Sequence, residues 1–284
     1  MNIYDKSPMN YTGGKYRILP QIMEYFPKNV DVMVDLFAGG CDVCSNFKAN
    51  KIYANDINNY IIDIYKKMQG MPINDILNYI DSTIKEFELS MYNQEAYLKF
   101  RQYYNQSQNK NPLDLYVLIC YSFNYQFRFN NKHEFNSPFG RNRSSFNNTM
   151  RENLIKFHRN IQGIVFSAFN FKDFDVGFLK ENDFLYSDSP YLISTGNYND
   201  GKRGFEGWSK NDDIALFELL DSLNDKGVKF ALSNVVEHKG LKNEMLIEWA
   251  NKYNTHNIDF NYKNSSYHGK NTDKRTVEVL ITNY

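Results

Sequence analysis

Residues 30–40 read VDVMVDLFAGG, a run of mostly apolar residues that ends in two glycines. The run predicts a buried strand, and the glycines predict a tight turn after it. We expect a helix from about residue 42 to 49 and a second strand at 52–54, which ends at Asn55 and Asp56. Strand, glycine turn, helix, strand and acid make up the first half of a nucleotide-binding βαβ unit.

The same residues indicate which class of ligand this unit binds. Gly39 and Gly40 would open room for an adenosyl group, and Asp56 would accept hydrogen bonds from ribose hydroxyls. The glycines do not follow the G-x-G-x-x-G spacing, so a dinucleotide is not favoured. The unit therefore predicts a cofactor that contains a nucleoside.

A second informative stretch, residues 184–191, reads FLYSDSPY. Its apolar start predicts a short strand, which Pro190 prevents from continuing in a sheet. Pro190 also restricts Ser189 to extended geometry, so the Asp188 side chain and the Ser189 carbonyl are held in a set relation. Two such oxygen acceptors beside the Tyr191 ring would suit a planar amino group on a base. The alternative is a strand end whose aspartate caps a turn.

The remaining α/β elements surround these two stretches. We expect a helix at 18–25, strands at 164–166 and 228–232, and a final strand pair near 258–262 and 276–281. Ser209 and Asp212 form a capping-box start for a helix with a leucine-rich face, after a polar, Gly-rich loop at 194–207.

Between residues 57 and 159 the pattern changes to apolar residues at helical spacing, as in Ile61, Ile64, Tyr65 and Met68. We therefore expect a helical domain inserted after the second strand. The later part of this segment, residues 128–159, contains seven Lys or Arg against two Glu, a net charge of +5. Basic residues interleaved with aromatic and amide side chains are suited to reading a DNA groove. A solvated basic face is the alternative.

Composition sets the broader limits. The chain has 284 residues, 42% hydrophobic content and a formal net charge of zero, so the charge of the whole chain indicates no polyanionic partner. An odd cysteine count of three implies no disulfide framework, and the C-x-x-C of Cys41 and Cys44 has no second pair for a zinc site. No run reaches the ~18 apolar residues of a membrane span, and the N-terminus lacks an apolar signal core. We expect a soluble, intracellular protein.

Taken in order, these pieces resemble the Dam-like family of adenine-specific DNA methyltransferases. The family order is a Tyr-x-Gly-Gly-Lys opening, a Phe-x-Gly turn, an acid after the second strand, a helical insertion and then Asp-Pro-Pro-Tyr. Its counterparts here are residues 11–15, 37–39, Asp56, the insertion with 128–130 and 137–140, and residues 188–191. Residues 278–280 also resemble the family's ending. On its residues alone, the opening at 11–15 would be a turn before a helix, and it lacks the P-loop spacing.

The resemblance implies a Rossmann-like methyltransferase fold and S-adenosylmethionine as methyl donor, with S-adenosylhomocysteine as product and no metal. It divides the chain into a catalytic part at 1–56, a target-recognition domain at 57–160 and a second catalytic part at 161–284. It implies catalytic roles for Asp188, Ser189, Pro190 and Tyr191. The implied cofactor residues are Tyr11, Gly14, Lys15, Asp35, Phe37, Gly39, Asp56, Asp173, Phe174, Asp188 and Tyr198, and the implied DNA-binding residues are Asn124, Arg128, Asn130, Pro138, Arg141 and Arg143.

The partner would be double-stranded DNA, bound by a monomer or weak dimer in the cytoplasm of a bacterial or phage system. A short palindrome, most often GATC, is the implied target. Two departures stand out: Cys41 replaces the family's second turn glycine, and Ser189 replaces a proline that acts through its carbonyl. Three alternatives stay open, namely a cytosine amino-methyltransferase, an RNA methyltransferase and a catalytically weak DNA-binding protein on the same fold.

Overall fold

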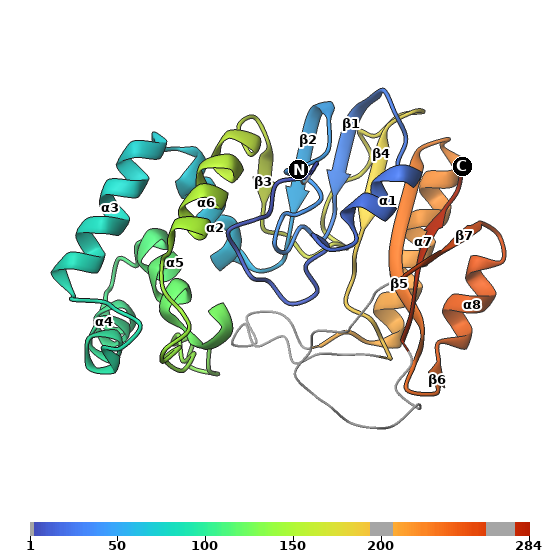
Figure 1. Ribbon diagram of the computed structural model, residues 1–284. Helices are drawn as coiled ribbons and strands as arrows, with labels where there is room; N and C mark the ends of the chain where they lie inside the picture. The colour runs from blue at the N-terminus through green and yellow to red at the C-terminus, as the bar shows by residue number, and fades with distance from the viewer. Residues whose placement is uncertain (1–2, 194–206, 260–275) are drawn as a thin grey trace.

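The computed structural model describes residues 3–193, 207–259 and 276–284. Its centre is a mixed sheet with strand order β3-β2-β1-β4-β5-β8-β7, and β6 pairs with β5 (Figure 1). The strands are β1 Val30–Asp35, β2 Ala49–Asn55, β3 Val165–Ser167, β4 Phe184–Ser187, β5 Lys229–His238, β6 Leu241–Lys242, β7 Asn254–Ile258 and β8 Thr276–Thr282. This is the predicted α/β, Rossmann-like arrangement.

Successive side chains of a strand point to opposite faces, and both faces of this sheet are covered. On one face Met33 and Phe184 pack with α1, Leu19–Tyr25, through its Ile22. On the other face lie Val34 and Leu185, together with α7, Lys210–Asp225, and α8, Glu244–Ala250. A sheet buried on both sides explains why its central strands read as continuous apolar runs.

The strand order changes direction between β1 and β4. From β1 the chain continues outward to β2 and β3, and from β4 it continues to β5 on the other side. The parallel register pairs Asp35 of β1 with Tyr186 of β4, so the residues after these two strands start from the same edge. Ligands of doubly wound sheets bind at this kind of switch point.

The segment between β2 and β3 is helical, as predicted. Its helices are α2 Asn59–Gln69, α3 Ile73–Glu86, α4 Gln94–Gln106, α5 Pro112–Tyr121, the short 3₁₀ turn η1 Phe123–Tyr125 and α6 Asn148–Asn160. All ten residues of α5 except Pro112 are buried, because the other helices surround it. The group lies beyond the β3 end of the sheet (Figure 1).

Several predicted elements differ from the structure. The helix expected at 42–49 is absent: residues 42–46 form consecutive turns, and β2 already begins at Ala49. The Asn46 side chain bonds the carbonyl of Asp42, which the backbone of a continuing helix would have used. β5 extends to His238, and β7 lies at 254–258, earlier than expected. The loop expected at 194–207 and the first expected strand of the final pair, 258–262, fall largely outside the described residues, as does Tyr198.

Candidate active site

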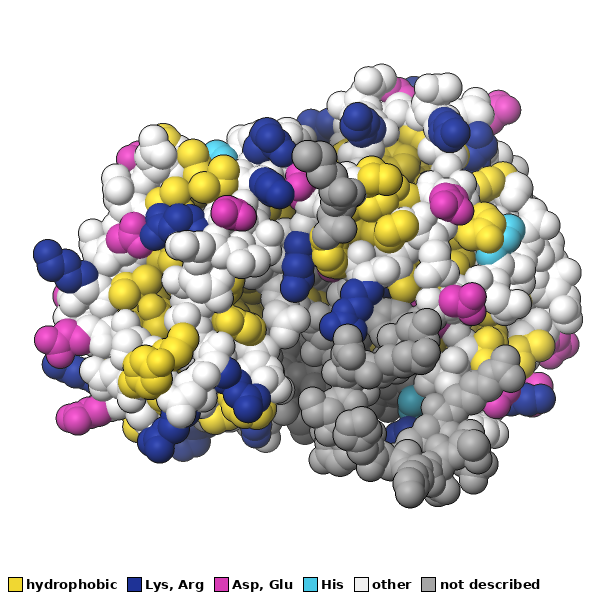
Figure 2. Space-filling model, viewed as in Figure 1, with side chains coloured by type: hydrophobic (Ala, Val, Ile, Leu, Met, Phe, Trp, Pro, Cys, Tyr) yellow, Lys and Arg dark blue, Asp and Glu magenta, His cyan; other side chains and the backbone are white. Residues whose placement is uncertain are grey.

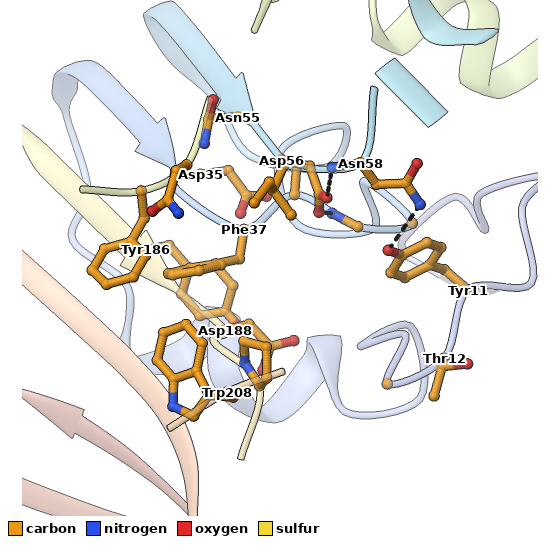
Figure 3. Close-up of a pocket in the computed structure, with 18 of the residues that line it drawn as sticks. Tyr11, Thr12, Asp35, Phe37, Asn55, Asp56, Asn58, Tyr186, Asp188 and Trp208 are labelled. Carbon is orange, nitrogen blue, oxygen red and sulfur yellow. Dashed lines mark hydrogen bonds between the residues drawn. The ribbon is translucent and has the colours of Figure 1, made fainter. Parts of the chain in front are cut away.

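A cavity of about 710 Å³ opens at the switch point (Figure 3). Residues from six parts of the chain line it: the segment 11–15, the end of β1 with the turn that follows, the end of β2 with the residues that follow, residues 169–172, the end of β4 with the residues that follow, and residues 207–212. Figure 3 shows Tyr11 and Asn58 on one side of the cavity and Phe37, Asp188 and Trp208 on the other. The predicted cofactor residues that line it are Tyr11, Gly14, Lys15, Asp35, Phe37, Gly39, Asp56 and Asp188.

The turn after β1 is held by Asp56. One carboxylate oxygen accepts the Gly39 N–H at 2.8 Å, and the other accepts the Asn58 N–H at 2.8 Å. Gly39 has a φ of +45°, and a Cβ there would lie 3.0 Å from the Tyr11 ring, so only glycine fits. A carboxylate oxygen can accept more than one hydrogen bond. Asp56 can therefore brace the turn and still accept a hydrogen bond from a ligand.

Close packing also explains the glycine at position 14. A Cβ on Gly14 would lie 3.0 Å from Asp42 Oδ2 and 3.3 Å from the Tyr11 carbonyl oxygen. The turn of residues 11–14 therefore packs directly on the residues after β1, and the Gly14 N–H donates to the Tyr11 carbonyl at 3.1 Å. This packing places the Tyr-x-Gly-Gly-Lys opening in the cavity wall.

Two further carboxylates in the cavity wall are buried. Asp35 is 1% exposed; its Oδ2 accepts the Cys44 N–H at 3.2 Å, and its Oδ1 has no partner within the described residues. Burial, and then the negative charge of Asp188, raise the pKa of Asp35. Burial also raises the pKa of Asp42 to about 6. A cavity with this excess of acid suits a cationic ligand.

Asp188 lies just beyond the end of β4 in a compact polar cluster. Its Oδ2 lies 2.8 Å from Lys15 Nζ, and its Oδ1 accepts the Tyr191 hydroxyl at 2.9 Å. Lys15 also donates to Tyr191 Oη at 2.9 Å and to the Gly13 carbonyl at 3.0 Å. Burial raises the pKa of Asp188, whereas the Lys15 ammonium lowers it. The cation therefore favours the carboxylate form in a buried setting.

Ser189 and Pro190 occupy the positions that the sequence predicted for them beside Asp188. Ser189 is buried and is not among the residues that line the cavity. Pro190 does line it. Tyr191 is half-buried, and its hydroxyl bonds Asp188. The Lys15 ammonium lies 5.3 Å from the centroid of the Tyr191 ring.

Sequence reasoning missed three residues around this site. Trp208 and Phe171 form an aromatic wall with Phe37, at centroid distances of 5.6 Å from Phe37 to Trp208 and 5.4 Å from Phe171 to Trp208. Glu278 lies 6% exposed beside Lys15 and Tyr191. A glutamate within the apolar strand at 276–281 was the signal that could have identified it.

Two predicted cofactor residues lie outside the cavity wall. Asn170, Phe171 and Lys172 line it, whereas Asp173 and Phe174 do not. Phe174 packs instead against the hydrophobic core under α7.

The predicted DNA-binding segment folds beside the cavity entrance. The Asn10 side chain donates to the Asn124 carbonyl at 2.8 Å, which ties the segment to the chain next to Tyr11. The rings of Tyr11 and Phe127 lie 6.4 Å apart. Figure 2 shows Lys and Arg side chains along the border between the helical part and the sheet.

The six candidate side chains of this segment differ in their surroundings. Arg143 donates to Asn124 Oδ1 at 3.1 Å, and Arg141 donates to Gln94 at 2.8 Å. The Asn130 amide bonds Glu134, and its carbonyl oxygen accepts the N–H groups of Lys132 and Glu134, so this side chain shapes its own turn. Pro138 is exposed, and its carbonyl accepts the Phe123 N–H at 2.7 Å.

Arg128 is the exception among them. Its side chain is exposed and makes no hydrogen bond or ion pair within residues 3–193, 207–259 and 276–284. Of the predicted base-reading groups, the guanidinium of Arg128 is therefore the most available to DNA.

Cys41 and Cys44 form a disulfide in the structure, with their Cα atoms 5.5 Å apart, although the odd cysteine count implied no disulfide framework. Cys41 has a φ of +59°, the left-handed conformation that glycine adopts readily. The backbone therefore keeps the shape of a glycine position at this departure from the family pattern.

The described part of the chain contains neither a metal-binding cluster nor a membrane-spanning helix. No group of three or more His, Cys, Asp or Glu side chains there is placed to hold a metal ion. None of the helices in that part is long and apolar enough to cross a membrane.

Comparisons with known proteins identify the family of this chain. Residues 11–264 match the family model of the D12 class N6 adenine-specific DNA methyltransferases. Type II methyltransferase M.FokI of Planomicrobium okeanokoites is 49% identical over 288 residues, which cover 100% of this chain and 43% of that protein. Modification methylase StsI of Streptococcus sanguinis is 49% identical over 285 residues, which cover 99% and 43%.

DNA adenine methylase of Escherichia coli K12 is 25% identical over 276 residues, which cover 96% of this chain and 93% of that protein. The chain thus spans less than half the length of the M.FokI and StsI proteins, and nearly the full length of the Escherichia coli enzyme. The family match covers most of the chain and includes the turn, the cavity and the Asp188 cluster. The chain belongs to the D12 class of N6 adenine-specific DNA methyltransferases.

Proposed function

We propose that this chain transfers a methyl group from S-adenosylmethionine to the exocyclic amine of an adenine flipped out of double-stranded DNA. The observation that carries the proposal is the placement of Asp188. Its carboxylate lines the cavity beside Lys15, which supports a role as hydrogen-bond acceptor for an amine.

The cavity fits the methyl donor on two grounds. The buried, unpartnered oxygen of Asp35 and the nearby carboxylate of Asp42 suit the positive charges of a sulfonium and an ammonium. Phe37, Phe171 and Trp208 offer an aromatic wall for an adenine ring, and the Asp56 carboxylate at the turn is of the type that accepts hydrogen bonds from ribose hydroxyls. When bound, S-adenosylmethionine supplies an electrophilic methyl group.

The protein's own contribution is to position the target amine. An exocyclic amine of adenine is a weak nucleophile, because its lone pair is delocalised into the ring. Asp188 and the Ser189 carbonyl would each accept one N–H, which favours the electron distribution of an attacking amine. The base must leave the duplex to reach them, and the Tyr191 ring offers a stacking surface. In-line positioning of the reacting atoms would supply much of the rate enhancement.

DNA would bind along the basic segment, with Arg128 reading a base edge. GATC is the proposed site because residues 128–130 and 137–140 resemble the recognition segment of Dam-type enzymes. The two relatives with 49% identity are modification methylases rather than Dam enzymes, so another short site is the competing outcome. An aspartate at position 188, where cytosine-directed enzymes often carry serine, favours adenine over cytosine.

Sequencing of methylated genomic DNA tests activity and target together. The chain is expressed in a methylation-free bacterial host, alongside its Asp188→Ala variant. We expect modified adenine in one short motif, present with the wild-type chain and absent with the variant. Modified adenine in a motif other than GATC would overturn the target and keep the chemistry. Unmodified DNA in both strains, with soluble protein present, would count against the activity.

A further inference from the structure

Glu278 is a buried acid with no place in the cavity wall. It lies in β8, is 6% exposed, and is flanked by Val277 and Val279. Its Oε1 lies 3.3 Å from the Tyr191 hydroxyl and 3.7 Å from Lys15 Nζ. Glu278 thus contacts Lys15 and Tyr191 without lining the cavity itself.

Lys15 and Tyr191 therefore lie between two carboxylates. Asp188 is 17% exposed and lines the cavity, and Glu278 is 6% exposed and does not line it. Both carboxylates approach the same ammonium and the same hydroxyl, with the shorter distances to Asp188. Burial raises the pKa of Glu278, and the Lys15 charge lowers it.

The charges of Asp188, Lys15 and Glu278 indicate what Glu278 contributes. Asp188 and Lys15 alone sum to zero, so this pair by itself carries no net negative charge. With ionised Glu278 the three groups sum to minus one. In the reaction proposed above, one positive charge passes from the sulfonium to the target nitrogen, next to Asp188. A net negative cluster stabilises that charge more in the transition state than in the ground state.

We propose that Glu278 is a positioning residue for methyl transfer. It acts through Lys15 and Tyr191 without touching the substrate. It holds the ammonium and the hydroxyl in place, and it offsets the Lys15 charge so that the Asp188 carboxylate stays available to the amine. This inference rests on the proposed function.

The test compares Glu278→Gln with Glu278→Asp in single-turnover methylation. Glutamine keeps the size and an acceptor but removes the charge, whereas aspartate keeps the charge. We expect Gln to slow the transfer by about tenfold or more, with the Kd for DNA within about threefold, and Asp to recover a clear part of the loss. Glu237→Gln, on the neighbouring strand β5, is the matched control and should leave the rate unchanged. A wild-type rate in Glu278→Gln would overturn the proposal, as would equal losses in the Gln and Asp variants.

A second measurement separates this inference from the proposed activity. Thermal unfolding of Lys15→Met, Glu278→Gln and the double variant gives a cycle that needs no turnover. We expect Glu278→Gln to destabilise the wild type but not the Lys15→Met protein, a difference of about 2 °C or more in Tm. Additive changes in Tm would show that Glu278 and Lys15 are not coupled, and would overturn the inference even in an active enzyme. Coupling without methylation would locate the failure in the proposed function instead.

Discussion

Lys15 Nζ lies 2.8 Å from Asp188 Oδ2, and this ion pair joins the N-terminal turn to the end of β4. Both side chains are largely withdrawn from water, at 8% and 17% exposure. A buried pair of this kind adds little net stability, but the loss of one partner leaves the other charge uncompensated. The main role of this ion pair is therefore to hold the site together, since its contribution to stability is small.

The first prediction concerns Asp188. Asp188→Ala should reduce methylation by about 100-fold or more, because the amine loses its acceptor. Affinity for S-adenosylmethionine should fall much less, since the turn, Asp56 and the aromatic wall are intact. Initial rates and calorimetric titration measure the two effects. Asp175→Ala, at an exposed aspartate that bonds the Gly177 N–H, is the control. Near-normal turnover in Asp188→Ala would remove the assignment.

The second prediction separates the ring of Tyr191 from its hydroxyl. Tyr191→Phe keeps a stacking surface and loses the hydrogen bonds to Asp188 and Glu278. Tyr191→Ala loses both, and the missing base stacking should cost a further ~1–3 kcal/mol. The rate and the KM for DNA of both variants, measured side by side, check this order. Equal losses in the two variants would mean that the ring does not stack on the base.

The third prediction concerns Arg128. If its free guanidinium reads a guanine, Arg128→Ala should relax specificity at one position and cost ~1–3 kcal/mol in binding to the cognate site. A purely phosphate-binding Arg128 would instead weaken binding on all sequences and reduce its salt dependence. Affinities for the cognate duplex and for single-base variants, at two salt concentrations, distinguish the outcomes. Arg141→Ala is the comparison, because that side chain is already bonded to Gln94.

The fourth prediction is a pH dependence at Asp42, whose pKa burial raises to about 6 from 3.8. A raised pKa means that the folded state binds this proton more tightly than the unfolded state. The group's contribution to stability is therefore fully present below pH 3.8 and is lost as pH rises to about 6. At pH 8 the loss amounts to about 3 kcal/mol, which Asp42→Asn avoids.

Denaturant unfolding of Asp42→Asn and the wild type at pH 4 and pH 8 checks this. The variant should gain stability relative to the wild type as pH rises. A difference for Asp42→Asn that is the same at both pH values would contradict the burial argument.

Local sequence signals were enough for the central strands β1 and β4, whose ends lie at the cavity. The apolar run at 30–35, the glycines that follow it and the proline at 190 each act through neighbouring residues, so the ends of β1 and β4 could be predicted. The capping box of Ser209 and Asp212 formed as expected.

The remaining features depend on contacts between distant segments. The seven-residue helix α8 is too short to show a clear period. The helix expected at 42–49 does not form. The Asn46 side-chain amide instead donates hydrogen bonds to the carbonyls of Asp42 and Asp5. Trp208 and Glu278 reach the site through tertiary packing alone. Asn130 looked available for a base edge, but its amide is used within its own turn.

The most direct test of the account is the chemical identity of the methylated product. The chain is incubated with unmethylated DNA and S-adenosylmethionine that carries an isotopically labelled methyl group. The DNA is then digested to nucleosides for mass spectrometry. The account predicts label in N6-methyl-2′-deoxyadenosine, and none when Asp188→Ala replaces the wild type. Label in a methylated deoxycytidine, or undiminished label with Asp188→Ala, would contradict it.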